Sequence, residues 1–361
     1  MKLIDDYRNP KRLQERLEVA RQLCTTRWTI MDVCGGQTHS LLRYGIEAAL
    51  ADSLEFVHGP GCPVCVTPAE VIDAAIALSL RPQVLLATFG DMLRVPGRTG
   101  SLLQARAAGG QIRTVYSPCD AVQLAARHPD LKVVFLAVGF ETTVPSTALA
   151  ILQAEARRLD NFSLLAHHVR VEPAMRVVAA APSAPLSAFL AAGHVCTITG
   201  YQSLSTLAAD FRLPVIVTGF EPLDLIEGII GCLEQLETGR AEVENRYPRC
   251  VRLQGNPDAL RLIDRVFAVS DLPWRGFGIL RDGGFVFRKD YSQFDARQQF
   301  RLDVVDPQTP DGESSCTAVL TGAMRPPDCP LFGTVCTPDA PKGAPMVSSE
   351  GACAAYFRYA R

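Results

Sequence analysis

The sequence has no segment suited to a membrane and no basic patch suited to nucleic acid. No window approaches ~18 uninterrupted apolar residues, the length that a membrane-spanning helix needs. The charged first 22 residues lack the apolar core of a signal peptide. Lys and Arg are scattered along the chain and the formal net charge is −2, which argues against a concentrated nucleic-acid-binding surface. The sequence therefore predicts a cytoplasmic protein that binds neither membrane nor nucleic acid.

Common catalytic signatures are also absent. The sequence has no G-x-x-x-x-G-K-[ST] nucleotide loop, no G-x-S-x-G elbow, no H-E-x-x-H motif and no closely spaced cysteine triplet of the radical-enzyme type. It does have 12 cysteines. Thiols stay reduced in the cytoplasm, so this number favours metal ligands or redox groups over a disulfide framework. Five of them are expected to be small packing residues, namely Cys24, Cys119, Cys196, Cys232 and Cys250.

Short apolar runs that end in glycine and a polar residue recur along the first two thirds of the chain. Runs that are apolar on both faces are typical of buried parallel strands, and helix-like stretches lie between them. This alternation predicts an α/β protein with parallel sheets, and polar residues at the strand ends mark where such folds bind ligands. The runs lie at residues 28–33, 54–57, 84–89, 133–138 and 215–218.

The chain is too long for one compact core, because 361 residues usually form two or three domains. We expect two related parallel-sheet α/β domains at residues 1–132 and 133–240, since strand ends in both carry Phe-Gly-Asp or Gly-Phe-Glu. The alternation fades after about residue 239, and proline and glycine become frequent. We therefore expect residues 241–361 to form a small domain that a metal, rather than a large core, keeps ordered.

Cys34 is expected between a strand end and the start of a helix. Gly35 and Gly36 follow it and let backbone amides approach a ligand closely, and His39 comes five positions after the thiol. A thiolate near such amides and an imidazole could hold a metal fragment or act as a nucleophile. The alternative is a tight turn whose thiol has no chemical role.

Cys62 and Cys65 form a Cys-x-x-Cys pair. Thr67, Pro68 and Glu70 have the pattern of an N-cap, a first helical residue and a capping box. The pair would then lie just ahead of the positive end of a helix, where thiol pKa values fall. A redox dithiol is the favoured interpretation, and half of a zinc site or two buried packing residues are the alternatives.

Four more cysteines lie near the end of the chain with the spacing C-x12-C-x6-C-x16-C. Four thiolates can hold a [4Fe–4S] cluster or a structural zinc ion. Zinc ribbons usually supply their ligands as two close pairs, and the absence of any pair closer than C-x6-C favours the cluster. The four residues are Cys316, Cys329, Cys336 and Cys353.

Six longer segments resemble signatures of the HypD family of hydrogenase maturation factors, and the likeness covers nearly the whole chain. The resemblance implies two related α/β domains plus an iron–sulfur domain, which agrees with the strand pattern. The segments are MDVCGGQTH (31–39), HGPGCPVCVTP (58–68), TFGDMLRVPG (88–97), GFETT (139–143), DCPLFG (328–333) and MVSSEGACAAY (346–356).

The resemblance also implies a scaffold that builds the Fe(CN)2CO unit of [NiFe]-hydrogenases. A small HypC-type chaperone would help to hold the iron, and a HypE-type protein would deliver cyanide. Cys34 would bind the iron with support from His39, and the amides of Gly35 and Gly36 would donate to cyanide. Glu141 and His194 are expected to act in proton transfer or in a contact between domains.

By the same resemblance, the four rear cysteines would carry a [4Fe–4S] cluster, and Cys62 and Cys65 would be a redox-active dithiol. Our hypothesis is that the cluster passes electrons from a donor to this dithiol. Two other classes of protein remain open. An iron–sulfur thiol/disulfide oxidoreductase would use the cluster and the dithiol but would leave Cys34 without a role. A zinc-stapled binding protein would have no redox activity.

Overall fold

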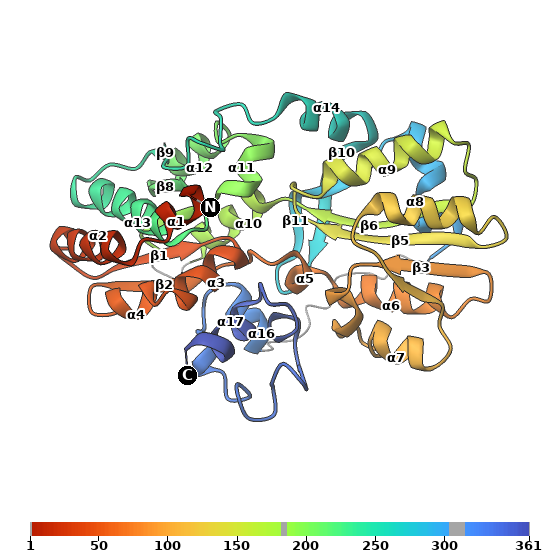
Figure 1. The fold of residues 1–361 in the computed structure, drawn as a ribbon, viewed down its shortest axis with the longest axis horizontal. Helices are drawn as coiled ribbons and strands as arrows, with labels where there is room; N and C mark the ends of the chain where they lie inside the picture. Colours follow the sequence, from red (N-terminus) through yellow and green to blue (C-terminus); the bar gives the residue numbers. More distant parts are fainter. Residues whose placement is uncertain (1, 182–185, 303–314, 361) are drawn as a thin grey trace.

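Two β-sheets, between which the chain passes several times, organise the molecule (Figure 1). The computed structural model describes residues 2–181, 186–302 and 315–360. The first sheet has the strand order β2-β1-β7-β8-β9, and all of its pairings are parallel. Its strands are β1 (Trp28–Asp32), β2 (Leu54–His58), β7 (Ala188–Ala192), β8 (Val215–Thr218) and β9 (Val243–Asn245).

The second sheet has the strand order β10-β11-β6-β5-β3-β4. Its central strands are parallel, whereas β10 and β11 form an antiparallel hairpin that pairs antiparallel with β6. Its strands are β3 (Val84–Thr88), β4 (Ile112–Thr114), β5 (Lys132–Gly139), β6 (Phe162–Val169), β10 (Phe267–Trp274) and β11 (Gly278–Phe287).

The predicted α/β class is confirmed, and the five apolar runs singled out in the sequence form β1, β2, β3, β5 and β8. The sheets do not follow the boundaries expected at residues 132 and 240. Strands from residues 28–58 join strands from 188–245 in one sheet, and strands from 84–169 join those from 267–287 in the other. An apolar pattern identifies a strand but not its partner, because a crossover connection can lead into either sheet.

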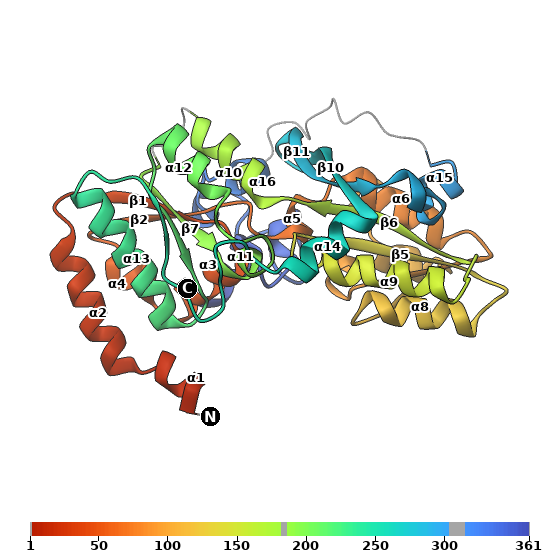
Figure 2. The same cartoon turned by 90° about the horizontal axis from the view of Figure 1, so that it is seen from above.

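Helices cover both faces of each sheet (Figure 2) and enclose three apolar cores. No described helix has the length and apolar character needed to cross a bilayer. The α-helices are α1 (Lys2–Tyr7), α2 (Pro10–Leu23), α3 (Gly35–Arg43), α4 (Ile46–Leu50), α5 (Pro63–Val66), α6 (Ala69–Ser79), α7 (Leu102–Ala107), α8 (Pro118–Arg127), α9 (Val144–Ala156), α10 (Val171–Ala180), α11 (Gly193–Thr199), α12 (Leu204–Phe211), α13 (Pro222–Glu237), α14 (Pro257–Val266), α15 (Ala296–Gln299), α16 (Ser315–Leu320) and α17 (Ala352–Tyr359). The 3-10 helices are η1 (Asp91–Arg94), η2 (Lys289–Phe294), η3 (Pro326–Asp328) and η4 (Ala344–Met346).

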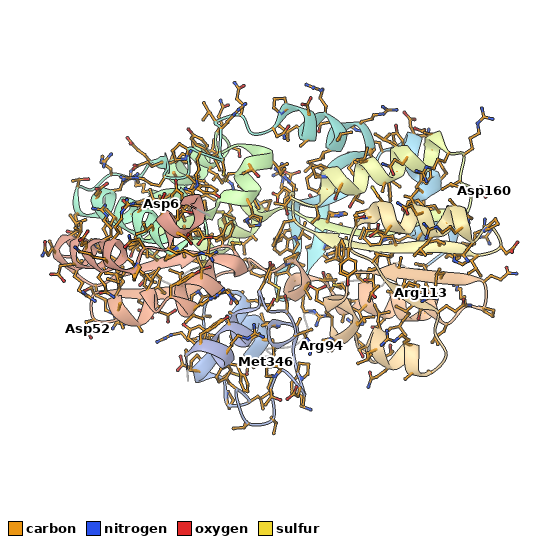
Figure 3. All side chains as sticks on the ribbon, in the orientation of Figure 1. Asp6, Asp52, Arg94, Arg113, Asp160 and Met346 are labelled. Carbon is orange, nitrogen blue, oxygen red and sulfur yellow. A yellow bond between two sulfur atoms is a disulfide. The ribbon has the colours of Figure 1, made fainter. Side chains whose placement is uncertain are left out.

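Residues 315–360, here called the C-terminal segment, lie beside α3 and α5 where the two sheets approach each other (Figure 1). The segment consists of α16, η3, η4, α17 and the loops between them. Arg94 of η1 donates to the carbonyls of Pro338 and Val347 at 3.2 and 3.3 Å, and Figure 3 shows Arg94 next to Met346. Tyr356 of α17 contacts Glu47 of α4. The segment therefore contacts both parts of the molecule.

Candidate metal and redox site

Two loops that follow neighbouring strands bring predicted site residues to one edge of the first sheet. β1 and β2 run parallel, so the loops that carry Cys34 and Cys62 leave the sheet side by side. The Gly35 amide, which was expected to face a ligand, instead donates to the Gly61 carbonyl at 2.9 Å. A Cβ on Gly61 would lie 2.4 Å from the Cys34 nitrogen and Cα. Glycine at position 61 is therefore what lets the two loops touch.

The Cys34 thiol is buried beside an imidazole. Cys34 is the N-cap of α3, and its Sγ lies 3.7 Å from Nδ1 of His194 in α11. Burial raises the pKa of this thiol to about 12, although the amides of Gln37 and Gly36 act in the opposite direction. Burial also lowers the pKa of His194 to about 4. A protonated thiol thus faces a neutral ring near pH 7.

His39 makes a different contact from the one expected. Its Nε2 pairs with the Tyr359 hydroxyl at 3.1 Å, and the two rings meet edge to face. His39 also lines a surface cavity of about 350 Å³ together with Arg94 and Arg358. The imidazole in contact with Cys34 is therefore that of His194, and His39 faces α17.

A cavity of about 310 Å³ lies next to this contact, between the two sheets. Its walls include Gly61 after β2, Asp91 after β3, Thr143 after β5 and His194 after β7, and the C-terminal segment contributes Glu350. Burial raises the pKa of both Asp91 and Glu350. The cavity thus gathers one imidazole and two carboxyl groups that hold their protons more tightly than exposed carboxyl groups do.

Cys62 and Cys65 form a buried disulfide. Cys62 is the N-cap of α5, and the Cys65 amide donates to Cys62 Sγ at 3.2 Å. The expected capping box is wrong. Thr67 is the C-cap of α5, and its hydroxyl donates to the Pro63 carbonyl. The N-cap of α6 is Pro68. As half of a zinc site the pair would first have to be reduced, since zinc binds thiolates.

The β10–β11 hairpin of the second sheet holds α5 in place. Arg275 at the tip of the hairpin donates its backbone amide to the Val66 carbonyl at 2.8 Å. Its guanidinium group donates to the carbonyls of Thr67 and Pro96 at 2.7 and 2.8 Å. The disulfide loop, which starts from the first sheet, is therefore fixed by the second.

The four rear thiols line one small pocket of the C-terminal segment, with apolar walls from Val319, Phe332 and Met346. Burial raises the pKa of Cys353, and the charges of the other three thiols raise it further. The Lys342 amide donates to Cys336 Sγ at 3.4 Å. Among the described residues, no three His, Cys, Asp or Glu side chains are grouped as ligands of a single metal ion. The thiols are Cys316, Cys329, Cys336 and Cys353.

Glu141 lies outside the cavity beside Cys34. It follows β5 and lines a separate pocket of about 40 Å³ with Arg170 and Cys196. Its Oε1 accepts the Val171 amide at the start of α10 at 3.1 Å, and its buried Oε2 has no hydrogen-bond partner among the described residues. Burial raises the pKa of Glu141 to about 7. Glu141 thus contacts the helix through which the chain passes from β6 to β7.

Sequence reasoning assigned no role to Asp91 and Glu350, two residues of the cavity next to Cys34. Asp91 and Glu350 stand inside the segments TFGDMLRVPG and MVSSEGACAAY, so their place in a family signature was an available signal. For His194, the sequence offered only a general role in proton transfer or in a contact between domains, and not a contact with Cys34. Only the pairing of β1 with β7 brings it to Cys34, across 160 positions of sequence.

The fold is α/β, with parallel strand pairs in both sheets. Its candidate site consists of a buried thiol, a disulfide and a pocket lined by four thiols, so the protein belongs to the class of α/β proteins whose chemistry rests on cysteine. The family described as "HypD: Hydrogenase formation hypA family" matches residues 10–360. The chain is 43% identical over 370 residues to the hydrogenase maturation factor HypD of Escherichia coli (strain K12), covering 99% of this chain and 98% of that protein. It is 44% identical over 375 residues to HypD of Rhizobium leguminosarum bv. viciae, covering 100% and 96%. The chain belongs to the HypD family of hydrogenase maturation factors.

Proposed function

We propose that this protein is the scaffold on which the Fe(CN)2CO unit of [NiFe]-hydrogenases is built, together with a HypC-type chaperone and a HypE-type cyanide donor. The observation that carries the proposal is the placement of the Cys34 thiol against His194, next to a cavity between the two sheets. A soft thiolate suits low-spin iron, and cyanide and carbon monoxide favour that spin state. The cavity of about 310 Å³ has room for an iron atom with small ligands.

Iron is the cargo in this proposal, and the residues of the chain prepare the site for it. Cys34 must lose its proton to bind iron, and its raised pKa means that the metal itself drives that loss. His194 is neutral and lies at 3.7 Å, so its ring nitrogen can receive the proton. The Gly36 and Gln37 amides then stabilise the thiolate from the helix side. Asp91 and Glu350 also line the cavity, and burial raises the pKa of both carboxyl groups.

The rear cysteines hold a [4Fe–4S] cluster in this proposal. Four thiols around an apolar pocket, with an amide donating to one sulfur, are the donor set that such clusters use. A bound cluster would supply electrons, taken from a separate electron donor, for the reduction of the Cys62–Cys65 disulfide. That reduction consumes two electrons and two protons and yields two thiols. Arg275 keeps α5 in place while the sulfurs change state.

The test is Cys34→Ala in protein that is purified without oxygen together with the two partner proteins. We expect the infrared bands of iron-bound carbon monoxide and cyanide to disappear while the brown absorption of the cluster persists. Cys250→Ala is the matched control, because Cys250 is exposed and lies outside the site. Bands that persist in Cys34→Ala would show that the iron is bound elsewhere.

An iron–sulfur thiol/disulfide oxidoreductase is the second candidate, and the disulfide that is already formed between Cys62 and Cys65 favours it. Such an enzyme would reduce a partner disulfide and would not need Cys34. Turnover of a generic small disulfide that is equal in the native protein and in Cys34→Ala would support this candidate. Absence of turnover would leave the scaffold as the function.

A further inference from the structure

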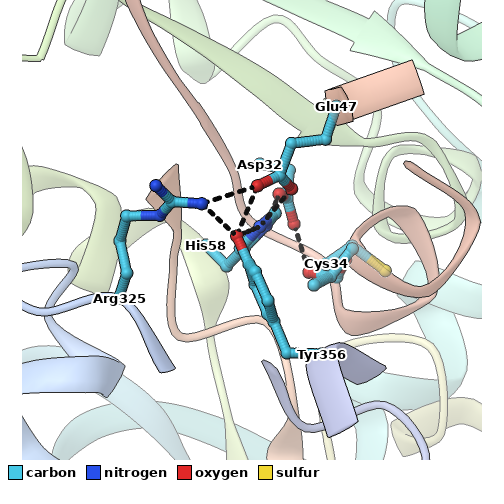
Figure 4. Close-up of polar contacts among 7 residues, drawn as sticks. Asp32, Cys34, Glu47, His58, Arg325 and Tyr356 are labelled. Carbon is cyan, nitrogen blue, oxygen red and sulfur yellow. Dashed lines mark hydrogen bonds and ion pairs between the residues drawn. The ribbon is translucent and has the colours of Figure 1, made fainter. Parts of the chain in front are cut away.

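Four buried polar side chains and one exposed arginine form a network beneath the Cys34 loop (Figure 4). They are Asp32 at the end of β1, Glu47 in α4, His58 at the end of β2, and Arg325 and Tyr356 of the C-terminal segment. Asp32 and His58 are almost fully shielded from solvent, with 0% and 4% of their surface exposed. Buried charges persist only when each is paired, so the bonds within this group decide whether it is stable.

His58 is the centre of the network. Its Nδ1 lies 2.5 Å from Asp32 Oδ1, and its Nε2 lies 3.1 Å from Glu47 Oε2. Both ring nitrogens face carboxylates, so both donate and the ring carries a positive charge. Burial opposes that charge, but the attraction of Asp32 and the bonds to both carboxylates outweigh it and hold the pKa of His58 well above its usual value.

One arm of the network reaches the Cys34 loop. The Thr38 hydroxyl donates to Asp32 Oδ2 at 2.6 Å, and the Thr38 amide donates to the Cys34 carbonyl at 3.1 Å. Asp32 precedes Cys34 by two residues and Thr38 follows it by four. The bond between them therefore closes a short bridge across the loop and fixes the direction in which the Cys34 thiol points.

The other arm reaches the segment that carries the rear cysteines. The Tyr356 hydroxyl donates to Glu47 Oε1 at 2.5 Å, and Arg325 reaches the same oxygen at 3.2 Å. Tyr356 lies in α17, one helical turn after Cys353, and Arg325 stands four residues before Cys329. Both residues that contact Glu47 from the C-terminal segment thus stand three or four positions in sequence from a cysteine of the four-thiol pocket.

We propose that this network makes the orientation of the Cys34 thiol depend on the C-terminal segment being folded around its cluster. The inference rests on the proposed function for the identity of the cluster, but its hydrogen bonds do not require a metal. His58 and Tyr356 are positioning residues, since they act on Cys34 through Asp32 and Thr38. If α17 loosens, Glu47 loses Tyr356, and the buried His58–Asp32 pair must rearrange or become solvated. Cys34 is then oriented to bind iron only when the C-terminal segment is folded around its cluster.

The test measures how fast a small haloacetamide alkylates Cys34, quantified by mass spectrometry of the peptide that contains it, in protein without iron cargo. Thr38→Val removes the hydroxyl at nearly constant shape, and Thr38→Ser keeps it. We expect alkylation about threefold to tenfold faster in Thr38→Val and in Tyr356→Phe, the change that the loss of one buried hydrogen bond produces, and a native rate in Thr38→Ser. The visible absorption of the cluster should remain in all three.

Loss of the cluster provides a second test. Cys353→Ser should accelerate alkylation to the rate of Tyr356→Phe, and combining the two changes should add nothing further. Equal Cys34 rates in native protein, Thr38→Val and Tyr356→Phe, with the cluster intact, would overturn the inference. Native protein that holds no iron or sulfide would overturn the proposed function instead, and the Thr38 and Tyr356 variants would still decide the positioning role.

Discussion

At the scale of single residues, the positions without a side chain are as informative as the thiols. Gly61 and Cys34 lie so close that a Cβ on Gly61 would meet backbone atoms at 2.4 Å. A backbone clash of this kind cannot be relieved by rotating a side chain. The contact between the two loops therefore requires a residue without a Cβ at position 61.

Gly61→Ala should separate the Cys34 and Cys62 loops. We expect it to lower the free energy of unfolding by about 1–3 kcal/mol, the range for overpacking a close contact, and to increase alkylation of Cys34. Gly90→Ala is the matched control, because a Cβ there meets nothing within 4 Å and its φ of −65° suits any residue. Urea unfolding measures both variants, and equal losses in the two would contradict the proposed contact.

Glu141 should make stability depend on pH. Burial raises its pKa from 4.5 to about 7, so the folded protein binds this proton more tightly than the unfolded chain. The stability that this proton provides is complete below pH ~4.5 and is lost as the pH rises through about 7. Relative to Glu141→Gln, the native protein should lose up to about 3 kcal/mol across that window. Parallel stability curves from pH 4.5 to 8 would show that Glu141 keeps its ordinary pKa.

At the scale of elements, the sequence located five of the described strands, missed six others and gave no information on which strands pair. A run such as residues 133–138 is apolar on both faces, and that is the condition for a central parallel strand. Nothing in it states that β5 pairs with β3 and β6 and not with β8. The helix start expected at Thr67 failed for a local reason, because the Thr67 hydroxyl closes the turn of α5 instead.

The four-thiol pocket of the C-terminal segment leads to a prediction about metal content. Protein purified without oxygen should contain about four iron atoms and about four acid-labile sulfides per chain. Cys329→Ser should lose most of both, whereas Cys119→Ser, which changes a half-buried cysteine outside the C-terminal segment, should lose neither. Chemical iron and sulfide analysis, together with zinc analysis, distinguishes the outcomes. Stoichiometric zinc without sulfide would favour the zinc-stapled binding protein.

At the scale of the whole molecule, the candidate site is assembled from parts that are remote in sequence. The motifs around Cys34 and Cys62 were visible in the sequence, and the parallel pairing of β1 with β2 makes them neighbours. His194 and Glu350 reach the same place only through the pairing of β1 with β7 and the packing of the C-terminal segment. Spacing along one sequence carries no information about such contacts, so His39 was expected where His194 stands.

The C-terminal segment is held to the second sheet by Arg94, and this attachment can be tested directly. Arg94 of η1 donates to the carbonyls of Pro338 and Val347. Arg94→Gln shortens the side chain and removes its charge, so both bonds are lost, and the segment should open locally at a free-energy cost about 1–2 kcal/mol smaller than in the native protein.

Limited proteolysis measures such opening, because cleavage within the C-terminal segment requires the segment to leave its site. Arg94→Gln should be cleaved there about fivefold to thirtyfold faster than native protein, the factor that this free energy implies. Arg113→Gln, which changes an exposed arginine of β4, should behave as the native protein does. Cleavage at the same rate in both variants would mean that contacts with helices beside the first sheet, such as Tyr356 with Glu47 of α4, are sufficient to hold the segment. Because Ser348, Ser349 and Glu350 belong to this segment, its opening should also leave the cavity of about 310 Å³ next to Cys34 without one wall.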